Sequence, residues 1–326
     1  MTAGKDGPLR VAVIGVGHLG QHHARLYPTI DGCRLVAVVD RDPARAREVA
    51  SRHGVEALDD DRRLLEGTAP RVDAVSVAVP TDAHAEVASR FLEAGVAALV
   101  EKPIAPSLQE ADRLLESARR SGALLAVGHT ERFNPSVEAL ARRARNPRFI
   151  EAHRLGSFAP RSLDIDVVLD LMIHDIDIAL NLVGSPVRSV EAVGVNALTP
   201  RVDIANARIV FESGCVANLT ASRISAARTR KIRVFQADSY LSCDCAERSL
   251  EHYRLERSAG AAHPSIVREQ VEIPPDEPLR RELHAFVRAV RGEAPFSVPG
   301  EAGRAALEVA LAVAGKIIEE VPGMHP

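Results

Sequence analysis

The feature that most constrains this chain is a glycine-rich turn near its start. Gly15-Val16-Gly17-His18-Leu19-Gly20 fits the pattern G-x-G-x-x-G between an apolar run at 9–15 and a helical run at 18–28. In a strand–turn–helix unit, the first glycine permits a tight turn, the second lets the backbone approach a pyrophosphate, and the third allows close packing of helix on strand. Free N–H groups at the start of the helix can then bind phosphate oxygens. We therefore predict that a dinucleotide contacts Gly15, Gly17, His18, Leu19 and Gly20.

A carboxylate further along the chain indicates which dinucleotide is bound. Asp40 follows the last glycine of the turn by 20 residues and ends the second apolar run, 33–40. A carboxylate at that place accepts hydrogen bonds from the ribose hydroxyls and repels a 2′-phosphate. Arg41 beside it leaves some room for that phosphate, and a tight turn that binds nothing is the alternative for the glycine pattern alone. The combination predicts NAD, with contacts to Asp40 and Arg41.

Strand-like and helical runs alternate from the start of the chain to about residue 128. The further strands are expected at 73–79, 97–101 and 124–128, and the further helices at 43–53, 82–94 and 107–121. The strands are almost continuously apolar, as is typical of strands that are buried on both faces. This alternation predicts a parallel sheet with crossover helices, and hence a Rossmann domain over residues 1–128.

Polar residues follow two of these strands at the sheet edge where open α/β folds bind ligands. The sequence Glu-Lys-Pro at 101–103 ends one strand and directs Lys102 toward the cofactor, although a solvated lysine is the alternative. For the residues after the strand at 73–79, the alternatives to a cofactor contact are that Thr81 caps a helix and that His84 is a packed surface histidine. The predicted cofactor contacts at this edge are Pro80, Thr81, His84, Glu101 and Lys102.

After about residue 130 the pattern changes to one long helix and a series of strands. The expected elements are a helix at 164–183, strands at 187–197, 204–212, 215–222 and 230–242, and closing helices at 278–291 and 300–320. Successive strands joined by short turns predict an open, mostly antiparallel sheet. We therefore assign residues 129–326 to a second, α/β domain.

The helix expected at 164–183 carries a polar stripe between two apolar flanks. At about 100° per residue, Asp166, Asp170, His174, Asp177 and Asn181 fall within about 80° of one another. Burying such a stripe is costly unless its groups find partners or a ligand. Asp170 can hold the His174 imidazole in one tautomer and raise its basicity, as a general base requires. A solvent-facing stripe is the alternative. A metal site is disfavoured because the spacing is not H-E-x-x-H.

A second set of polar residues is expected around the same site. Arginines between the strand at 124–128 and the helix at 164–183 would match an anionic substrate through charge-assisted hydrogen bonds. The alternatives are helix-start and turn roles for Arg132 and Asn134, and pairing of Arg154 and Arg161 with carboxylates of Glu131, Glu151 or Asp164. The predicted substrate contacts are His129, Arg132, Asn134, Arg161 and Asp177.

Composition and charge disfavour several other classes of protein. Lys plus Arg is 41 and Asp plus Glu is 44, so the net charge of −3 argues against a nucleic-acid or membrane-surface protein. No apolar run approaches the roughly 18 residues of a membrane helix, and the first ten residues lack the apolar core of a secretory signal. The four cysteines, Cys33, Cys215, Cys243 and Cys245, are too few for a disulfide framework. We expect a cytoplasmic protein without a metal.

Taken together, these motifs resemble the Gfo/Idh/MocA family, the relatives of glucose–fructose oxidoreductase and inositol dehydrogenase. The resemblance covers essentially the whole chain and rests on the glycine turn, E-K-P at 101–103, D-x-x-x-H-x-x-D at 170–177 and the tail at 283–317. It implies a second domain with an open sheet that forms dimers or tetramers, and hydride transfer at a sugar or polyol carbon. The catalytic lysine, aspartate and histidine of the family map onto Lys102, Asp170 and His174.

The segments GHTERFNP and DVVLDLMIHDID most resemble family members that act on nucleotide-linked amino sugars. The resemblance implies NAD-dependent oxidation of a ring hydroxyl to a ketone, at C3 of a UDP-N-acetylhexosamine. His174, oriented by Asp170, would remove the hydroxyl proton, and Lys102 would stabilise the alkoxide. The 3-keto amino sugar would suit an aminotransferase and a lipopolysaccharide precursor pathway. The alternatives are a free polyol or sugar dehydrogenase, such as one for inositol or glucose, and a non-catalytic dinucleotide sensor.

Overall fold

The computed structural model describes residues 7–158, 165–257 and 263–320. These residues form two compact units. The first contains the residues up to Thr130 together with Glu277–Ala305, and the second contains Glu131–Asp276 with the residues from Ala306 onward. The predicted division at residue 128 therefore misses a return of the chain to the first unit. That return rests on contacts between residues far apart in sequence, which leave no local pattern.

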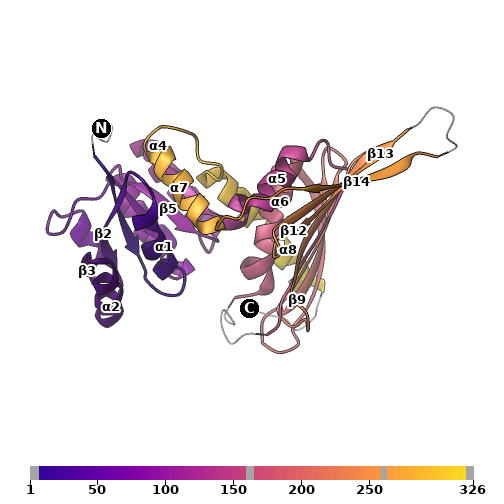
Figure 1. Cartoon of the computed structure of the whole chain (residues 1–326). Helices are drawn as coiled ribbons and strands as arrows, with labels where there is room; N and C mark the ends of the chain where they lie inside the picture. Colours follow the sequence, from indigo (N-terminus) through magenta and orange to yellow (C-terminus); the bar gives the residue numbers. More distant parts are fainter. Residues whose placement is uncertain (1–6, 159–164, 258–262, 321–326) are drawn as a thin grey trace. The chain divides into compact units, whose positions relative to one another are not determined.

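A parallel sheet forms the centre of the first unit (Figure 1). Its strands are β1 (Leu9–Ile14), β2 (Cys33–Val39), β3 (Glu56–Leu58), β4 (Ala74–Val77), β5 (Ala97–Glu101) and β6 (Leu125–Gly128). In the described part of the chain their order is β3-β2-β1-β4-β5-β6, which is the order of a doubly wound dinucleotide-binding sheet. β4, β5 and β6 are buried along their whole length, as their apolar runs predict. The predicted Rossmann domain is confirmed.

Helices cover both faces of this sheet, as a doubly wound fold requires. They are α1 (Gly20–Leu26) with the 3₁₀ turn η1 (Tyr27–Thr29), α2 (Pro43–His53), α3 (His84–Glu93), α4 (Leu108–Ser121) and α7 (Pro278–Val290). Local signals end or begin several of them. Gly122, with φ of 72°, ends α4, and the Ser107 side chain accepts a hydrogen bond from the N–H of Glu110 at its start. α7 contacts α1 and so brings the end of the chain back to this unit.

The second unit is built on a long mixed sheet. Its strands are β7 (Phe149–Leu155), β8 (Val187–Val195), β9 (Ile204–Phe211), β10 (Val216–Ser222), β11 (Thr229–Phe235), β12 (Ser239–Asp244), β13 (Ser249–Glu256) and β14 (Ser265–Val271). Among the described residues the order is β14-β13-β12-β11-β7-β10-β9-β8, with a parallel pair at β7 and β10. The predicted antiparallel character is confirmed. The run expected as one strand at 230–242 is instead a hairpin, in which Gln236 N–H donates to the Ser239 carbonyl.

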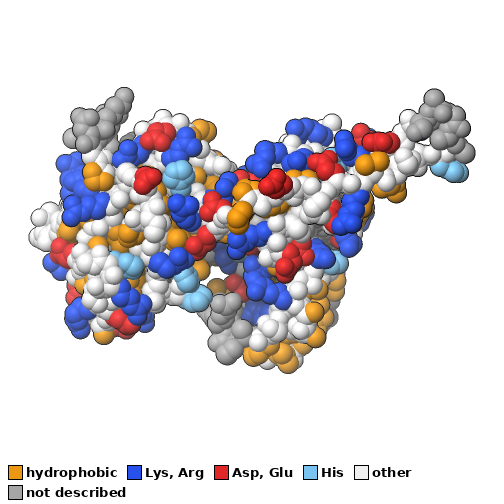
Figure 2. Space-filling view, viewed as in Figure 1, with side chains coloured by type: hydrophobic (Ala, Val, Ile, Leu, Met, Phe, Trp, Pro, Cys, Tyr) orange, Lys and Arg blue, Asp and Glu red, His pale blue; other side chains and the backbone are white. Residues whose placement is uncertain are grey.

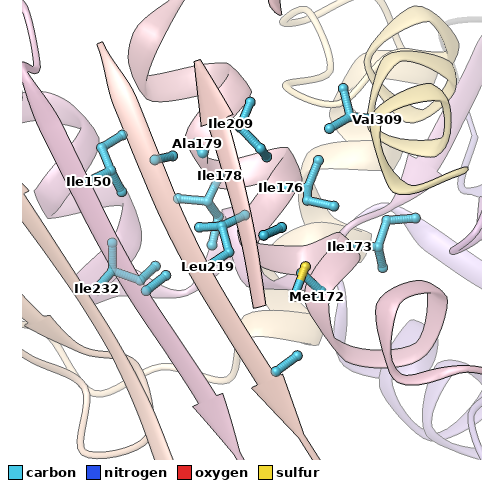
Figure 3. Packing of buried hydrophobic residues seen from close by; sticks show 14 of the residues in the cluster. Ile150, Met172, Ile173, Ile176, Ile178, Ala179, Ile209, Leu219, Ile232 and Val309 are labelled. Atoms are coloured by element: carbon cyan, nitrogen blue, oxygen red, sulfur yellow. The ribbon is translucent and has the colours of Figure 1, made fainter. Parts of the chain in front are cut away.

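Three helical segments lie on one face of this sheet in Figure 1: α5 (Pro135–Arg143), α6 (Ile173–Val183) with the π-helix η5 (Val168–Met172) before it, and α8 (Gly300–Glu320). Every second strand residue is buried against them, which is the alternation of a sheet covered on one face. Figure 3 shows this core, in which Ile176 and Ile178 of α6 lie near Leu219 of β10. The other face of the sheet stays partly exposed.

Candidate active site

The three glycines of the first turn differ in how much space a side chain would have at each position. Gly15 has φ of 83°, and a Cβ there would lie 2.6 Å from the carbonyl oxygen of Ala78. A Cβ on Gly20 would lie 1.8 Å from the carbonyl oxygen of Gly15, whereas a Cβ on Gly17 would have no atom within 4 Å. The first and third glycines are therefore required by the packing of the protein itself. The space beside Gly17 fits the close approach of a cofactor pyrophosphate to the backbone.

Asp40 is tied to this turn by its carboxylate. Its Oδ2 accepts from Val16 N–H at 3.0 Å and its Oδ1 accepts from Asp42 N–H at 3.0 Å, and Arg45 Nη1 donates to both oxygens, at 3.2 Å to Oδ1 and 3.3 Å to Oδ2. A carboxylate has about four acceptor positions, and these contacts use all of them, so a ribose hydroxyl would have to replace the contact with the largely exposed Arg45 side chain. Arg41 is exposed next to it. The glycine turn and Asp40 together fit the ribose and pyrophosphate of NAD.

The predicted contacts Pro80 and Thr81 follow β4, and the predicted contact His84 is the first residue of α3. Pro80 is exposed and Thr81 is half-buried, so both are accessible to a ligand. His84 is buried, and its ring nitrogens lie 2.9 Å from the Pro103 carbonyl oxygen and 3.0 Å from that of Val79. Burial holds the pKa of His84 below its usual value. Both ring nitrogens of His84 thus face backbone carbonyl oxygens of the protein, and contact of His84 with the cofactor stays a prediction.

The Glu-Lys-Pro segment lies at the carboxyl end of β5. Lys102 is half-buried, and the Lys102–Pro103 peptide bond is cis. The Glu101 carboxylate is directed into the protein, where it lies 3.0 Å from His23 Nε2 and accepts from Lys102 N–H at 3.3 Å. Burial raises the pKa of Glu101, but His23 and Lys102 lower it by more, so the carboxylate is ionised. The Glu101 carboxylate therefore has protein partners, and its contact with the cofactor stays a prediction.

His23 is a residue of this region that the sequence did not predict. It lies on α1 three residues after Gly20, on the side of the helix that also buries Ala24. A histidine among buried positions of a helix needs polar partners. This position of a histidine on the buried side of the helix is the feature of the sequence that could have indicated His23. The sequence alone does not show which residue it binds.

The predicted catalytic aspartate and histidine lie on consecutive turns in the second unit. Asp170 is on the π-helix η5 and His174 is in the first turn of α6, and both are half-buried. π-Helices are rare and frequently occur at functional sites. Asp166 caps the segment, since its Oδ1 accepts from the N–H groups of Val168 and Leu169 at 2.9 Å each. The polar stripe is therefore partly structural: Asp166 is a cap, whereas Asp170 and His174 are half-buried side chains on the stripe.

Most of the predicted substrate contacts take part in interactions within the second unit or at its border. Arg132 Nη1 lies 3.2 Å from Oδ1 of Asp177. Asn134 caps α5 through Oδ1 and donates from Nδ2 to the Cys245 carbonyl at 3.0 Å, so it has the helix-start role stated as the alternative, and its contact with the substrate stays a prediction. His129 is fully buried. Arg161 lies outside the described residues.

Arg154 also has carboxylate partners. It donates to both Asp175 oxygens at 2.9 and 2.8 Å, and Glu131 lies 3.3 Å away and also pairs with Arg230. Burial lowers the pKa of Arg154, but Asp175 and Glu131 raise it above its usual value. Of the alternatives stated for Arg154, pairing with Glu131 is the one found.

In the part of the chain that the structure describes, no three His, Cys, Asp or Glu side chains are grouped so that they could hold a metal ion. The four cysteines are free thiols, and the sulfur atoms of Cys243 and Cys245 are 3.9 Å apart. None of the described helices is long and apolar enough to cross a membrane.

Comparison with known families agrees with this geometry. A model described as an oxidoreductase family with an NAD-binding Rossmann fold matches residues 9–129, and a model of the GFO/IDH/MocA C-terminal domain matches residues 136–239. The chain belongs to the Gfo/Idh/MocA family. It is therefore an oxidoreductase with a Rossmann domain of the NAD-binding type, as the glycine turn and Asp40 predict.

Several members of the Gfo/Idh/MocA family match over nearly the whole chain. UDP-N-acetylglucosamine 3-dehydrogenase from Acidithiobacillus ferrooxidans is 40% identical over 306 residues, which is 94% of this chain and 96% of that protein. A solved structure of that name from the same organism has a TM-score of 0.87 at 39% identity and covers 95% of this chain and 97% of its own. Myo-inositol 2-dehydrogenase from Thermotoga maritima is 28% identical over 330 residues, 96% of this chain and 97% of that protein.

Replacing Asp40 by alanine is expected to weaken the preference for NAD over NADP. Hydrogen bonds to a charged group contribute about 1.5–3 kcal/mol, so kcat/KM with NAD should fall roughly 10–100-fold. Removal of the negative charge next to Arg41 and Arg45 should at the same time raise kcat/KM with NADP. Steady-state kinetics with both cofactors measure this ratio. Asp40→Asn, which keeps one oxygen for Val16 N–H, is the control for a loosened turn, and an unchanged ratio in both variants would contradict the assignment.

Proposed function

We propose that the protein is an NAD-dependent UDP-N-acetylglucosamine 3-dehydrogenase. The observation that carries this proposal is the 40% identity over 96% of an enzyme of that name. Lys102, Asp170 and His174 stand where the sequence motifs of such a dehydrogenase require a lysine, an aspartate and a histidine. The inositol dehydrogenase matches over a similar length at 28% identity. A free polyol is therefore the second candidate substrate.

In the proposed reaction, His174 removes the proton from the hydroxyl group at C3 of the sugar. Asp170, one turn earlier, favours the imidazole tautomer that can accept this proton. Lys102 donates a hydrogen bond to the same oxygen and stabilises the negative charge that develops on it. NAD, when bound, supplies the acceptor for the hydride. It would be held by the backbone beside Gly17 and by Asp40.

Among the proposed substrate contacts, Asp177 has one carboxylate oxygen that could accept a hydrogen bond from a substrate. Its Oδ2 is buried and accepts no hydrogen bond from the described residues, although Oδ1 pairs with Arg132. A buried carboxylate oxygen is costly to leave without a donor, and a substrate hydroxyl or amide would supply one. Pairing of Arg161 with a diphosphate stays a prediction from the sequence.

A substrate panel tests the proposed function. The purified protein is mixed with NAD and either UDP-N-acetylglucosamine, free N-acetylglucosamine or myo-inositol, and NADH is followed by absorbance at equal substrate concentrations. We expect the highest kcat/KM with the UDP sugar, because binding energy from the nucleotide can be used to position C3. Reduction of the product with borodeuteride should place deuterium at C3. Turnover of myo-inositol without any response to the UDP sugar would support the second candidate.

We also propose that the protein forms homo-oligomers through the open face of its second sheet. Phe149, Phe235, Tyr240 and Tyr253 stack across four strands on the face away from the helices, with ring centroids 5.6, 5.1 and 4.7 Å apart in turn. Val193 and Val195 of β8 are each 52% exposed. Figure 2 shows hydrophobic side chains gathered at one end of this unit, near the position of the β9 label in Figure 1. Sedimentation of the protein with and without Tyr240→Arg tests this proposal.

The proposed place of action is the cytoplasm. All four cysteines are free thiols, which is usual in a reducing compartment. The proposed product, a 3-keto amino sugar, has a carbonyl group that an aminotransferase can convert to an amine. A step in the synthesis of a lipopolysaccharide precursor fits such a product.

A further inference from the structure

A chain of buried polar groups runs beneath the Glu-Lys-Pro segment of the first unit. The Tyr27 hydroxyl lies 2.6 Å from Ser76 Oγ, Ser76 Oγ lies 3.1 Å from His23 Nδ1, and His23 Nε2 lies 3.0 Å from Glu101 Oε1. Tyr27, Ser76, His23 and Glu101 are 0%, 0%, 1% and 6% exposed. They come from η1, β4, α1 and β5, so the chain joins four elements of the Rossmann fold.

The two ends of this series of hydrogen bonds have a defined donor and acceptor. Ionised Glu101 only accepts, so His23 donates from Nε2. Ser76 Oγ accepts from the Tyr27 hydroxyl and shares its other hydrogen bond with His23 Nδ1. Burial holds the pKa of Tyr27 well above its usual value, which keeps this hydroxyl a donor. This series of hydrogen bonds ends at Tyr27, whose side chain is fully buried. We therefore assign it to holding side chains in place rather than to passing a proton to solvent.

The group that this chain fixes is the backbone of Lys102. Glu101 Oε2 accepts from Lys102 N–H at 3.3 Å, and the Pro103 carbonyl on the other side of Lys102 lies 2.9 Å from His84 Nδ1. The site has little room for another arrangement, because a Cβ on Gly128 would lie 3.0 Å from the Glu101 carboxylate. His23 thus acts through Glu101 on the peptide group before Lys102, and His84 contacts the peptide group that follows Pro103.

Stability alone is a weak reason for such a chain. Taking a carboxylate out of water is costly, and well-packed apolar side chains often replace a buried polar pair at no loss of stability. Lysine has a long, flexible side chain, and a misplacement of about 1 Å in an active site can cost 10²-fold in rate. Fixing the Lys102 backbone limits where its ammonium group can go.

We propose that His23 is a positioning residue for Lys102, acting through the Glu101 carboxylate, with His84 holding the other end of the same segment. The proposal rests on the proposed function, in that it takes Lys102 as the group that stabilises the reacting oxygen. It adds to that function a residue of α1 that touches neither cofactor nor substrate.

The kinetic test compares His23→Leu, which removes the donor to Glu101, with His23→Gln, which keeps an N–H donor. We expect His23→Leu to lower kcat on UDP-N-acetylglucosamine about 10–100-fold, with the KM for the sugar and the Kd for NADH within about 3-fold. His23→Gln should recover most of kcat. The matched control is His22→Leu, because His22 is the exposed neighbour on the same helix.

A second readout needs no turnover. The chain has four lysines, Lys5, Lys102, Lys231 and Lys316, so reductive ¹³C-methylation yields few NMR signals beyond that of the amino terminus. The Lys102 signal is assigned by its absence in Lys102→Arg. In His23→Leu this signal should shift or broaden, whereas in His23→Gln and His22→Leu it should match the wild type.

The two readouts separate the possible failures. An unchanged Lys102 signal in His23→Leu, or a kcat that falls only in proportion to lost folded protein, would overturn the positioning role. If the wild type does not oxidise the UDP sugar, the proposed function fails while the NMR comparison still decides on His23. Should His23→Leu not fold, Ser76→Ala removes the hydroxyl that is hydrogen-bonded to Nδ1 instead, and a wild-type kcat and Lys102 signal in that variant would also overturn the proposal.

Discussion

Replacing His174 by alanine is expected to lower kcat by about 10²–10⁴-fold, which is the usual contribution of a general base. Without the imidazole, no group of α6 takes the proton from the sugar hydroxyl in the proposed reaction. Binding of NADH should stay within about 2-fold, because His174 lies in the second unit and the glycine turn and Asp40 lie in the first. Titration with NADH by fluorescence measures this directly, since the chain contains no tryptophan.

Two further variants sharpen this result. Lys102→Ala should show a similar loss of kcat, whereas Asn181→Ala should not, because Asn181 is exposed two turns further along α6. Near-normal turnover in His174→Ala would remove His174 from the proposed role. Loss of NADH binding in the same variant would instead indicate that the substitution disturbs the fold.

Replacing Asp175 by alanine is expected to destabilise the second unit by about 3–5 kcal/mol. Arg154 is buried, and in this variant it would lose the carboxylate that receives both of its hydrogen bonds. Glu131 would remain 3.3 Å away but already pairs with Arg230, so it does not fully replace Asp175. Urea unfolding followed by circular dichroism measures the loss as a lower midpoint.

Two controls distinguish this effect from a general loss of surface charge. Arg233→Ala breaks an ion pair with Glu151 whose side chains are 46% and 30% exposed, and should cost at most about 1 kcal/mol. The double variant Arg154→Met with Asp175→Leu removes both charges and should recover much of the lost stability. A midpoint for Asp175→Ala as high as that of Arg233→Ala would contradict the assigned cost.

The dinucleotide-binding half of the molecule was predictable because its signals are local. α2 occupies the expected residues 43–53, and the positive φ of Gly15 together with the contact between Gly20 and Gly15 follow from the spacing of the glycine turn. The carboxylate that selects NAD is likewise found next to that turn. These features each depend on a few neighbouring residues, so the sequence alone carries them.

The polar residues of the second unit were less predictable because their partners are distant in sequence. Arg154 on β7 meets Asp175 on α6, and Asn134 reaches the carbonyl of Cys245. A sequence pattern cannot distinguish an arginine that binds a substrate from one that binds a carboxylate of the protein. The same reason explains His23, whose partner Glu101 is 78 residues away.

The return of residues 277–305 to the first unit matters during synthesis of the chain. β6 is an edge strand, and the Val127 N–H on it donates to the Val298 carbonyl at 3.0 Å. Domains commonly fold in order as the ribosome releases them, N-terminal first. Here the nucleotide-binding unit cannot complete its edge until almost all of the polypeptide has emerged. A fragment that stops after Thr130 would expose an unfinished strand edge, which is a template for aggregation. The ability to bind NAD therefore cannot be separated from the rest of the chain by a single cut.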